Sequence, residues 1–271
     1  MTLVDNLIVK KDIKAVLNSE IINWEQFRNK TIFITGATGG IGSFLIQCLL
    51  NANEEKKLSL KVIANVRNKK KALELFTKFL YRKDFKLFVS DVTNKIKYKN
   101  KVDFIVHCAN NTSSKSFVEK PVETIDIALN GTKNVLDFAV NKKAKSIVYL
   151  SSMEVYGEIN ENKLLSEKDL GEMNLLEVRS SYPMGKRAAE TLCYAYFKEY
   201  NLPIKIARLA QVIGANVDYD DTRVYAQFAR SIVEKKDIVL KTTGETIRSY
   251  CYITDVITAL LLLLEKGENG E

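Results

Sequence analysis

The feature that most constrains this sequence is a glycine-rich loop between a β-rich segment and a helix-forming segment. Residues 31–35 read Thr-Ile-Phe-Ile-Thr, and residues 41–50 have helical periodicity. Glycines in such a loop permit a tight turn and a close approach to a pyrophosphate, which the amides and dipole of the helix N-terminus then favour. This placement predicts a dinucleotide-binding loop, and a glycine-rich turn without a ligand is the alternative. The expected contact residues are Gly36, Thr38, Gly39, Gly40, Ile41 and Gly42.

Strand-like and helix-like segments alternate along the chain after this loop. The expected strands are residues 31–35, 60–66, 85–89, 102–107, 146–150 and 203–209, and the expected helices are residues 41–50, 70–81, 122–140 and 182–200. Strands separated by helices of this length pair in parallel through right-handed crossovers. The sequence therefore predicts an α/β fold, a doubly wound parallel sheet of the Rossmann type with a small C-terminal substrate lobe.

Three regions are expected, with approximate boundaries because their segments interleave. Residues 1–29 form an N-terminal helical extension in which Trp24 and Phe27 are available for packing. Residues 30–214 form the NAD(P)-binding domain that carries the catalytic residues. Residues 215–271, which no longer follow the alternation, form the smaller substrate-binding lobe.

Composition and cysteine usage place the chain among ordinary globular proteins. Hydrophobic residues make up 46% and charged residues 27% of the 271 residues, which excludes wholesale disorder. The four cysteines form no C-x-x-C pair, so we expect buried thiols in a reducing compartment and no metal site. The N-terminus lacks a signal-peptide core, and the longest apolar run, residues 259–264, is too short for a bilayer. A soluble cytoplasmic protein without a membrane partner is expected.

The formal net charge of +8 raises the possibility of a nucleic-acid partner. Lysines cluster at residues 69–71 and 142–143, each time after an apolar run, as at a solvated helix end. No aromatic residues are interleaved with them to stack on bases. We therefore expect no nucleic-acid partner.

The end of the second expected strand bears on the choice between NAD and NADP. An acidic residue there would bind the ribose hydroxyls, but this chain has Arg67 and no acid. Arg67 therefore favours NADP, and the alternative is that it stacks on adenine or faces solvent. Asp91 ends the third strand, where its carboxylate can accept the adenine amino group or simply form a turn.

Tyr182 and Lys186 are four residues apart at the start of an expected helix, so their side chains share one face. A nearby ammonium, together with the positive nicotinamide ring, should lower the pKa of Tyr182 toward the working pH. Tyr182 can then take the proton of a substrate hydroxyl while a hydride leaves for the nicotinamide. The pair is common by chance, so its meaning depends on the other motifs.

Four motifs occur in an order and spacing that resemble those of the extended short-chain dehydrogenase/reductase family, which comprises sugar-nucleotide epimerases, dehydratases and decarboxylases. They are Gly36-x-x-Gly39-x-x-Gly42, His107-Cys-Ala-Asn110, Ser151-Ser-Met-Glu-Val-Tyr-Gly157 and Tyr182-x-x-x-Lys186. The resemblance covers residues 30–270, and residues 179–196 are most similar to UDP-glucuronate decarboxylases. It implies that Val92, Ala109 and Asn110 also contact the cofactor, and that His107 is a structural residue.

The resemblance also implies roles around the substrate. Ser152 would hold the substrate oxygen beside Tyr182, and Glu154 would be the acid or base at the neighbouring carbon. Met153 stands where hexose dehydratases have an Asp that protonates the departing hydroxyl, and a thioether cannot donate that proton. This departure argues against 4,6-dehydration. The implied substrate-binding residues are Ser152, Met153, Gln211, Arg223 and Arg248.

Two of these assignments carry alternatives. Arg248 matches an arginine that grips the substrate diphosphate, a task suited to a bidentate guanidinium, but it could instead pair with Glu245 at the surface. Gln211 replaces an Asn of the relatives, so the substrate pocket is expected to differ. The chain ends at residues 270–271, before the relatives do, and either a shortened lobe or an incomplete chain would explain this.

The leading functional expectation is a nucleotide-sugar enzyme that transiently oxidises a ring hydroxyl with NAD(P). The alternatives are an NADPH-dependent reductase of an activated sugar or polyol and a non-catalytic NAD(P)-sensing regulator. The base, the sugar and the outcome stay open. A homodimer through residues 122–140 and 182–200 is expected, unless residues 1–29 cover that surface in a monomer. Residues 182–200 carry an apolar face through Ala189, Leu192, Cys193, Tyr196 and Phe197, and this face is broader than the single stripe that covers the sheet.

Overall fold

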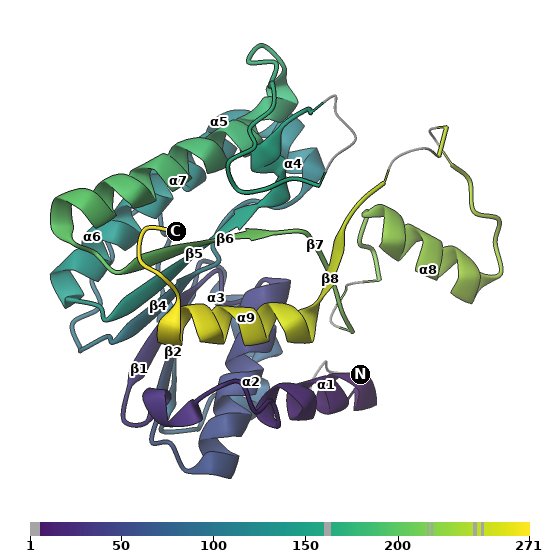
Figure 1. The fold of residues 1–271 in the computed structure, drawn as a ribbon. Helices are drawn as coiled ribbons and strands as arrows, with labels where there is room; N and C mark the ends of the chain where they lie inside the picture. Colours follow the sequence, from purple (N-terminus) through teal and green to yellow (C-terminus); the bar gives the residue numbers. More distant parts are fainter. Residues whose placement is uncertain (1–5, 160–163, 216, 218, 241–242, 245–246) are drawn as a thin grey trace.

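A six-stranded parallel sheet with the strand order β3-β2-β1-β4-β5-β6 forms the centre of the molecule (Figure 1). The computed structural model describes residues 6–159, 164–215, 217, 219–240, 243–244 and 247–271. The strands are β1 (Thr31–Thr35), β2 (Lys61–Val66), β3 (Phe85–Val89), β4 (Phe104–His107), β5 (Ser146–Ser152) and β6 (Ile204–Leu209). Every neighbouring pair is parallel, and the order reverses between β1 and β4. The predicted doubly wound α/β sheet is confirmed.

Helices cover both faces of this sheet. One face carries α1 (Leu7–Leu17), a 3₁₀ turn (Trp24–Phe27), α2 (Gly40–Lys56), α3 (Lys69–Leu75) and α9 (Ile253–Lys266). The other face carries α6 (Thr132–Lys142) and α7 (Ser181–Tyr200), and α4 (Ser114–Glu119) and α5 (Pro121–Asp126) pack beside α7. A π-helical turn, Ile127–Gly131, joins α5 to α6 within the helix predicted for residues 122–140. The helix predicted for residues 70–81 is shorter, because α3 gives way to a 3₁₀ turn, Thr77–Phe79.

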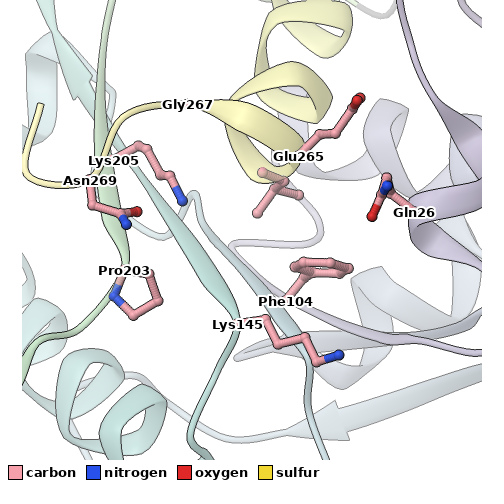
Figure 2. A pocket seen from close by; sticks show the side chains of 9 residues that line it. Gln26, Phe104, Lys145, Pro203, Lys205, Glu265, Gly267 and Asn269 are labelled. Atoms are coloured by element: carbon pink, nitrogen blue, oxygen red, sulfur yellow. The ribbon is translucent and has the colours of Figure 1, made fainter.

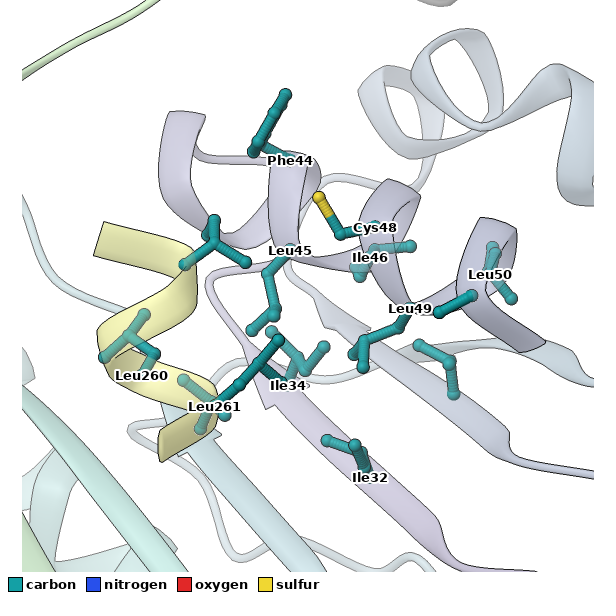
Figure 3. Packing of buried hydrophobic residues seen from close by; sticks show 14 of the residues in the cluster. Ile32, Ile34, Phe44, Leu45, Ile46, Cys48, Leu49, Leu50, Leu260 and Leu261 are labelled. Carbon is teal, nitrogen blue, oxygen red and sulfur yellow. The ribbon is translucent and has the colours of Figure 1, made fainter. Parts of the chain in front are cut away.

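The two faces contain separate hydrophobic cores because side chains alternate along each strand. In β1, Ile32 and Ile34 point toward α2, whereas Phe33 points toward α6. Figure 3 shows α2 and α9 packed over Ile32 and Ile34. Strands buried on both faces require nearly continuous apolar sequences, as β1 has.

The ends of the chain pack on the α2 side of the sheet. Trp24 and Phe27 are buried, and the Phe27 ring lies 5.5 Å from the Phe104 ring, edge-on. Helix α1 contacts both α2 and α9, and α9 also contacts β5 and β6. Helix α9 belongs by packing to the core of the sheet, although its sequence lies within the range predicted for the substrate lobe.

The described part of residues 211–252, which begins just before the boundary predicted at residue 215, forms a small substructure beside the carboxyl edge of the sheet (Figure 1). Strands β7 (Gln211–Ile213) and β8 (Tyr250–Tyr252) pair in parallel, and α8 (Val224–Glu234) extends away from the sheet. The large apolar side chains exposed in this substructure include Val224, Ile232, Val233, Ile238, Val239, Leu240 and Ile247. Among the helices that the structure describes, none has both the length and the hydropathy required to cross a bilayer.

Candidate active site

The glycine loop connects β1 to α2 and packs directly against the chain that leaves β4. Gly36 has a φ of +62°, and a Cβ on it would lie 2.7 Å from the Ala109 amide nitrogen. A Cβ on Gly42 would lie 2.6 Å from the Gly36 carbonyl oxygen. Both positions therefore require glycine, the first for conformation and space and the second for space. The loop lies where the strand order reverses, the usual place of a nucleotide in such sheets.

The polar groups around this loop fit a bound dinucleotide. Gly39 is the N-cap residue of α2, and no side chain caps this helix, so its first-turn amides suit a phosphate. The Nδ2 atom of Asn110 is buried and has no hydrogen-bond partner in the described chain, whereas its Oδ1 accepts a hydrogen bond from the Asn111 amide. A buried donor of this kind is costly unless a ligand satisfies it. The glycine loop, α2 and Asn110 therefore form a coherent cofactor site.

His107, the only histidine, lies behind the loop as a structural residue. It is buried, with Nδ1 2.7 Å from Thr35 Oγ1 and Nε2 3.2 Å from Thr132 Oγ1. Burial lowers the pKa of His107 to about 3, and the Lys186 ammonium adds to this shift. A neutral imidazole held between two hydroxyls ties β4 to β1 and α6. Thr35 Oγ1 also accepts a hydrogen bond from the Ala109 amide, 3.1 Å long, which fixes the chain next to Gly36.

Arg67 follows β2 at the place expected for the adenosine ribose. Its side chain is 65% exposed, and its Nη1 lies 3.3 Å from Glu123 Oε1 and 3.8 Å from Asp91 Oδ2. The guanidinium therefore faces two carboxylates, and Glu123 of α5 was not part of the sequence argument. Asp91 also accepts hydrogen bonds from the Thr93 amide and hydroxyl, so it forms the turn that the sequence allowed. The preference for NADP stays a prediction.

Tyr182 and Lys186 lie one turn apart in α7 and face the carboxyl end of β5. Both are buried, and the Lys186 ammonium donates a 2.5 Å hydrogen bond to the Leu150 carbonyl. It lies 5.9 Å from the Tyr182 ring centroid. Ser152 ends β5, two residues beyond Leu150. The structure thus brings the three predicted residues to one place, with the lysine directed at the backbone.

The electrostatics of Tyr182 differ from the sequence expectation. Burial raises the pKa of Tyr182 to about 12, and a hydrogen bond with the Ser152 hydroxyl opposes this rise. Burial also lowers the pKa of Lys186 to about 8. The expected lowering by the ammonium is not found because Lys186 is directed at the Leu150 carbonyl instead of the phenol. The nicotinamide ring, which the expectation also invoked, contributes only when the cofactor is bound.

Glu154 lies in a 3₁₀ turn just after Ser152 and forms a bidentate ion pair with Arg179. The two hydrogen bonds are 2.9 and 3.1 Å long. The Arg179 guanidinium lies 5.0 Å from the Phe117 ring, and that ring stacks on Tyr182 at 4.2 Å and 9°. The Arg179 guanidinium and the Phe117 ring therefore link the Glu154 carboxylate to the Tyr182 ring, through one ion pair and two ring contacts.

Sequence reasoning assigned no role to Arg179 or Phe117. Arg179 precedes Tyr182 by three residues, within the segment that carries the resemblance, so the helical spacing was an available signal. Phe117 lies in α4, 65 residues before Tyr182, and nothing in its local sequence indicates the contact. Only the packing of α4 beside α7 produces it.

The predicted substrate residues are spread over the edge of this site. Met153 follows Ser152 and is half-buried, and Gln211 is half-buried at the start of β7. Arg223 precedes α8, where its guanidinium hydrogen-bonds to Asp221. Arg248 is exposed just before β8, and its alternative partner Glu245 lies outside the described residues. The roles of these four residues in substrate binding stay predictions.

Comparison with known proteins yields a family match that spans residues 32–271, to the "NAD dependent epimerase/dehydratase family". The chain is 33% identical to UDP-glucuronic acid decarboxylase 3 of Arabidopsis thaliana, over 89% of this chain and 68% of that protein. In structure it is similar to UDP-glucuronic acid 4-epimerase from Bacillus cereus in complex with UDP-glucuronic acid and NAD, with a TM-score of 0.74, 25% identity and coverage of 88% and 74%.

A further similar structure is dTDP-glucose 4,6-dehydratase from Bacillus anthracis in complex with NAD. It has a TM-score of 0.74 and 22% identity, with coverage of 89% of this chain and 74% of that one, and so supports the fold alone. The family match and the decarboxylase similarity extend over the glycine loop, the end of β5 and α7. The resemblance seen in the four motifs is confirmed, and this chain belongs to the NAD dependent epimerase/dehydratase family.

Proposed function

We propose that this protein is a nucleotide-sugar-modifying enzyme that transiently oxidises a sugar hydroxyl with bound NAD(P). The observation that carries the proposal is the convergence of Tyr182, Lys186 and Ser152 at the carboxyl end of β5. The glycine loop begins two strands away in the same sheet, at the carboxyl end of β1. The relatives named for decarboxylation and epimerisation of UDP-glucuronic acid support this reaction class.

We assign proton transfer in the first step, the oxidation of the sugar hydroxyl, to Tyr182. Its phenolate oxygen takes the proton of the substrate hydroxyl, and Ser152 orients that hydroxyl by hydrogen bonding. When bound, the nicotinamide would accept a hydride from the carbon that carries this hydroxyl and could return it. Because burial raises the pKa of Tyr182 to about 12, ionisation needs a cation near the phenol. We propose that Lys186 supplies it by turning from the Leu150 carbonyl toward Tyr182 and the ribose.

We assign the second step, proton transfer at the sugar carbon next to the oxidised one, to Glu154. Its carboxylate is held in place by two hydrogen bonds from Arg179. To work as acid or base, Glu154 must exchange this partner for a proton or a substrate atom. Arg179 is thus proposed as a positioning residue that keeps the carboxylate beside the end of β5. Met153 leaves the neighbouring position without an acidic group, which favours epimerisation or decarboxylation over 4,6-dehydration.

The cofactor site is proposed to comprise the glycine loop, Asp91, Val92, Ala109 and Asn110, with Tyr182 and Lys186 at the nicotinamide end. Gln211, Arg223 and Arg248 are proposed to contact the nucleotide part of the substrate. The alternative of a net NADPH-dependent reductase depends on Arg67, whose charge is already shared with Asp91 and Glu123. A non-catalytic regulator is disfavoured because Ser152, Tyr182 and Lys186 occur together.

A homodimer in the cytoplasm is proposed for the assembled enzyme. The apolar face predicted for residues 182–200 does not supply this interface, because Ala189, Cys193 and Tyr196 are buried in the subunit's own core. Leu192 and Phe197 pack against that core as well.

The exposed apolar side chains beside α7 are Val118, Val122 and Ile125 of α4 and α5, which are better candidates for the dimer interface. Residues 7–17 cover the opposite face of the sheet and leave this surface free. A monomer mass by light scattering at micromolar concentration would contradict the dimer.

Native mass spectrometry against a panel of nucleotide sugars tests the proposed function. We expect the purified protein to retain NAD or NADP and to bind a subset of UDP, dTDP or CDP sugars. The decisive measurement follows the bound sugar over time. A product of altered mass or stereochemistry formed with no net consumption of cofactor supports transient oxidation, and stoichiometric oxidation of NADPH supports the reductase instead. Absence of any cofactor or sugar binding would contradict both.

A further inference from the structure

A buried lysine lies at the end of the sheet that is opposite the proposed active site. Lys205 is the second residue of β6 and is 4% exposed. Its ammonium donates one hydrogen bond, 2.8 Å long, to the Ser146 hydroxyl. Within the described chain no carboxylate forms an ion pair with it, and burial alone lowers the pKa of Lys205. The Lys205 ammonium therefore has N–H donors and a positive charge for which the described residues provide only the Ser146 hydroxyl.

The position of Lys205 is one where an apolar side chain would be expected. Side chains alternate along β6, so Lys205 faces the same core as Ala207, on the α9 side of the sheet. Its neighbour across the sheet is Val148, which is fully buried in that core. Burial of an uncompensated ammonium costs several kcal/mol even after relaxation. A lysine in this place is explained if a counter-ion from outside the chain occupies the space beside it.

Lys205 lines a cavity that can hold such a ligand (Figure 2). The cavity has a volume of about 330 Å³, within the range of small-molecule sites. It lies beneath the amino ends of β4, β5 and β6, against the C-terminal end of α9. Its apolar wall comprises Phe104, Pro203 and Leu264, and its polar lining includes Lys145, Gln26 and Asn269.

The charges around this cavity are mainly positive. Two lysines, Lys205 and Lys145, and one carboxylate, Glu265, line the cavity. Glu265 accepts a hydrogen bond from the Asn23 amide. Asp103 lies 3.0 Å from the Lys101 ammonium and 4.0 Å from the Lys145 ammonium, so Lys145 is partly compensated at the rim. Among the described residues, Lys205 is the lining cation that has no ion pair with a carboxylate.

We propose that this cavity binds a small-molecule oxyanion, a phosphate or carboxylate group carried on a compact apolar body. Lys205 and Lys145 would contact the oxyanion, and Phe104, Pro203 and Leu264 the apolar body. The site is separate from the active site, because Ser146 begins β5 and Ser152 ends it, about 20 Å away at ~3.3 Å per residue. A ligand here would connect β6 to α9, the helix that follows β8 in the chain.

Calorimetry on the full chain tests this site with three probes: inorganic phosphate, phenyl phosphate and benzoate. NAD is kept saturating so that the glycine loop does not contribute an anion site. We expect saturable binding of at least one probe, at least ten-fold weaker in Lys205→Met, which keeps the length of the side chain but removes its charge. Lys83→Met, an exposed lysine at the same end of the sheet, is the matched control and should bind as the parent does.

Thermal denaturation in anion-free buffer separates the binding role from a structural one. Lys205→Met should melt at a temperature no lower than the parent, because it removes a buried unpaired charge. Should this variant fail to fold, Lys145→Met at the rim, expected to weaken binding about three-fold, serves in its place. Absence of saturable binding to the parent, or equal affinity in parent and variant, overturns the proposal. Neither outcome depends on turnover, so the proposed enzymatic function stands or falls separately. The preferred probe distinguishes a phosphate from a carboxylate ligand.

Discussion

The cofactor loop is tightly packed against neighbouring backbone, whereas the β7–α8–β8 region, residues 211–252, exposes many of its described apolar side chains. Around the loop, Gly36 and Gly42 lie so close to neighbouring backbone that a Cβ would collide with it. In residues 211–252, by contrast, Ile232 and Val233 of α8 are 69% and 76% exposed, and none of the residues described there is as fully buried as Ile32, Phe33 and Ile34 of β1. The difference indicates that the sheet and its loop supply the buried core, whereas the described part of residues 211–252 supplies exposed apolar surface. In the proposed function, the chemistry at the end of β5 depends on the first region and the choice of substrate depends on the second.

The largest effect that sharpens this comparison is expected from Tyr182→Phe. The change keeps the ring that stacks on Phe117 but removes the ionisable oxygen. Turnover should fall about 100- to 10,000-fold, the usual contribution of a positioned general base. Steady-state assays on a sugar accepted by the parent would measure the loss, with calorimetry of NAD as a control for an intact cofactor site. Full activity in this variant would refute the mechanism.

Glu154→Gln should distinguish the reactions that the family permits. Removal of the carboxylate abolishes proton transfer at the neighbouring carbon but leaves intact the proton transfer to Tyr182 and the hydride transfer to the nicotinamide. If the reaction includes decarboxylation or elimination, overall turnover should fall by about 100-fold or more, while reduced nicotinamide accumulates and is visible by its absorbance. Largely retained activity would instead identify simple epimerisation or reduction. Arg179→Met is the companion variant, and it should lower turnover in the same direction by a smaller factor, because Arg179 no longer holds the Glu154 carboxylate in place.

A matched pair of substitutions tests the stability side of the comparison directly. Ile34→Ala in β1 removes a fully buried side chain and should lower the free energy of unfolding by about 2–5 kcal/mol. Ile232→Ala makes the same change in α8 at 69% exposure and should alter it by less than about 0.5 kcal/mol. Urea denaturation followed by circular dichroism measures both. Equal losses in the two variants would show that residues 211–252 are as essential to folding as the sheet.

The smallest expected effect concerns cofactor choice at the end of β2. If Arg67 binds a 2′-phosphate, the parent binds NADP more tightly than NAD, and Arg67→Ala reduces that preference by about ten-fold or less. The pairing of Arg67 with Asp91 and Glu123 limits the effect, because the phosphate must compete with two carboxylates. Calorimetry with both dinucleotides measures the ratio. Binding of NAD at least as tight as NADP in the parent would overturn the preference.

The sequence by itself determined the features that depend on neighbours along the chain. The turn at Gly36, the uncapped start of α2 and the shared face of Tyr182 and Lys186 follow from local conformation and helical spacing. The six strands and their parallel pairing follow from the alternation of β-rich and helical segments. Those predictions succeeded because each depends on a period or a spacing that a few consecutive residues encode.

The tertiary structure alone decided which distant side chains meet. It placed Phe117 on Tyr182, Glu123 beside Arg67, α9 on the core of the sheet and Lys205 in a cavity. It also buried Tyr182, which raises the pKa of that phenol, and it directed the Lys186 ammonium at the Leu150 carbonyl instead of the phenol. These contacts join residues tens of positions apart, and no local pattern encodes them. Burial and partner geometry set their energies, and both exist only once the sheet and its helices have packed.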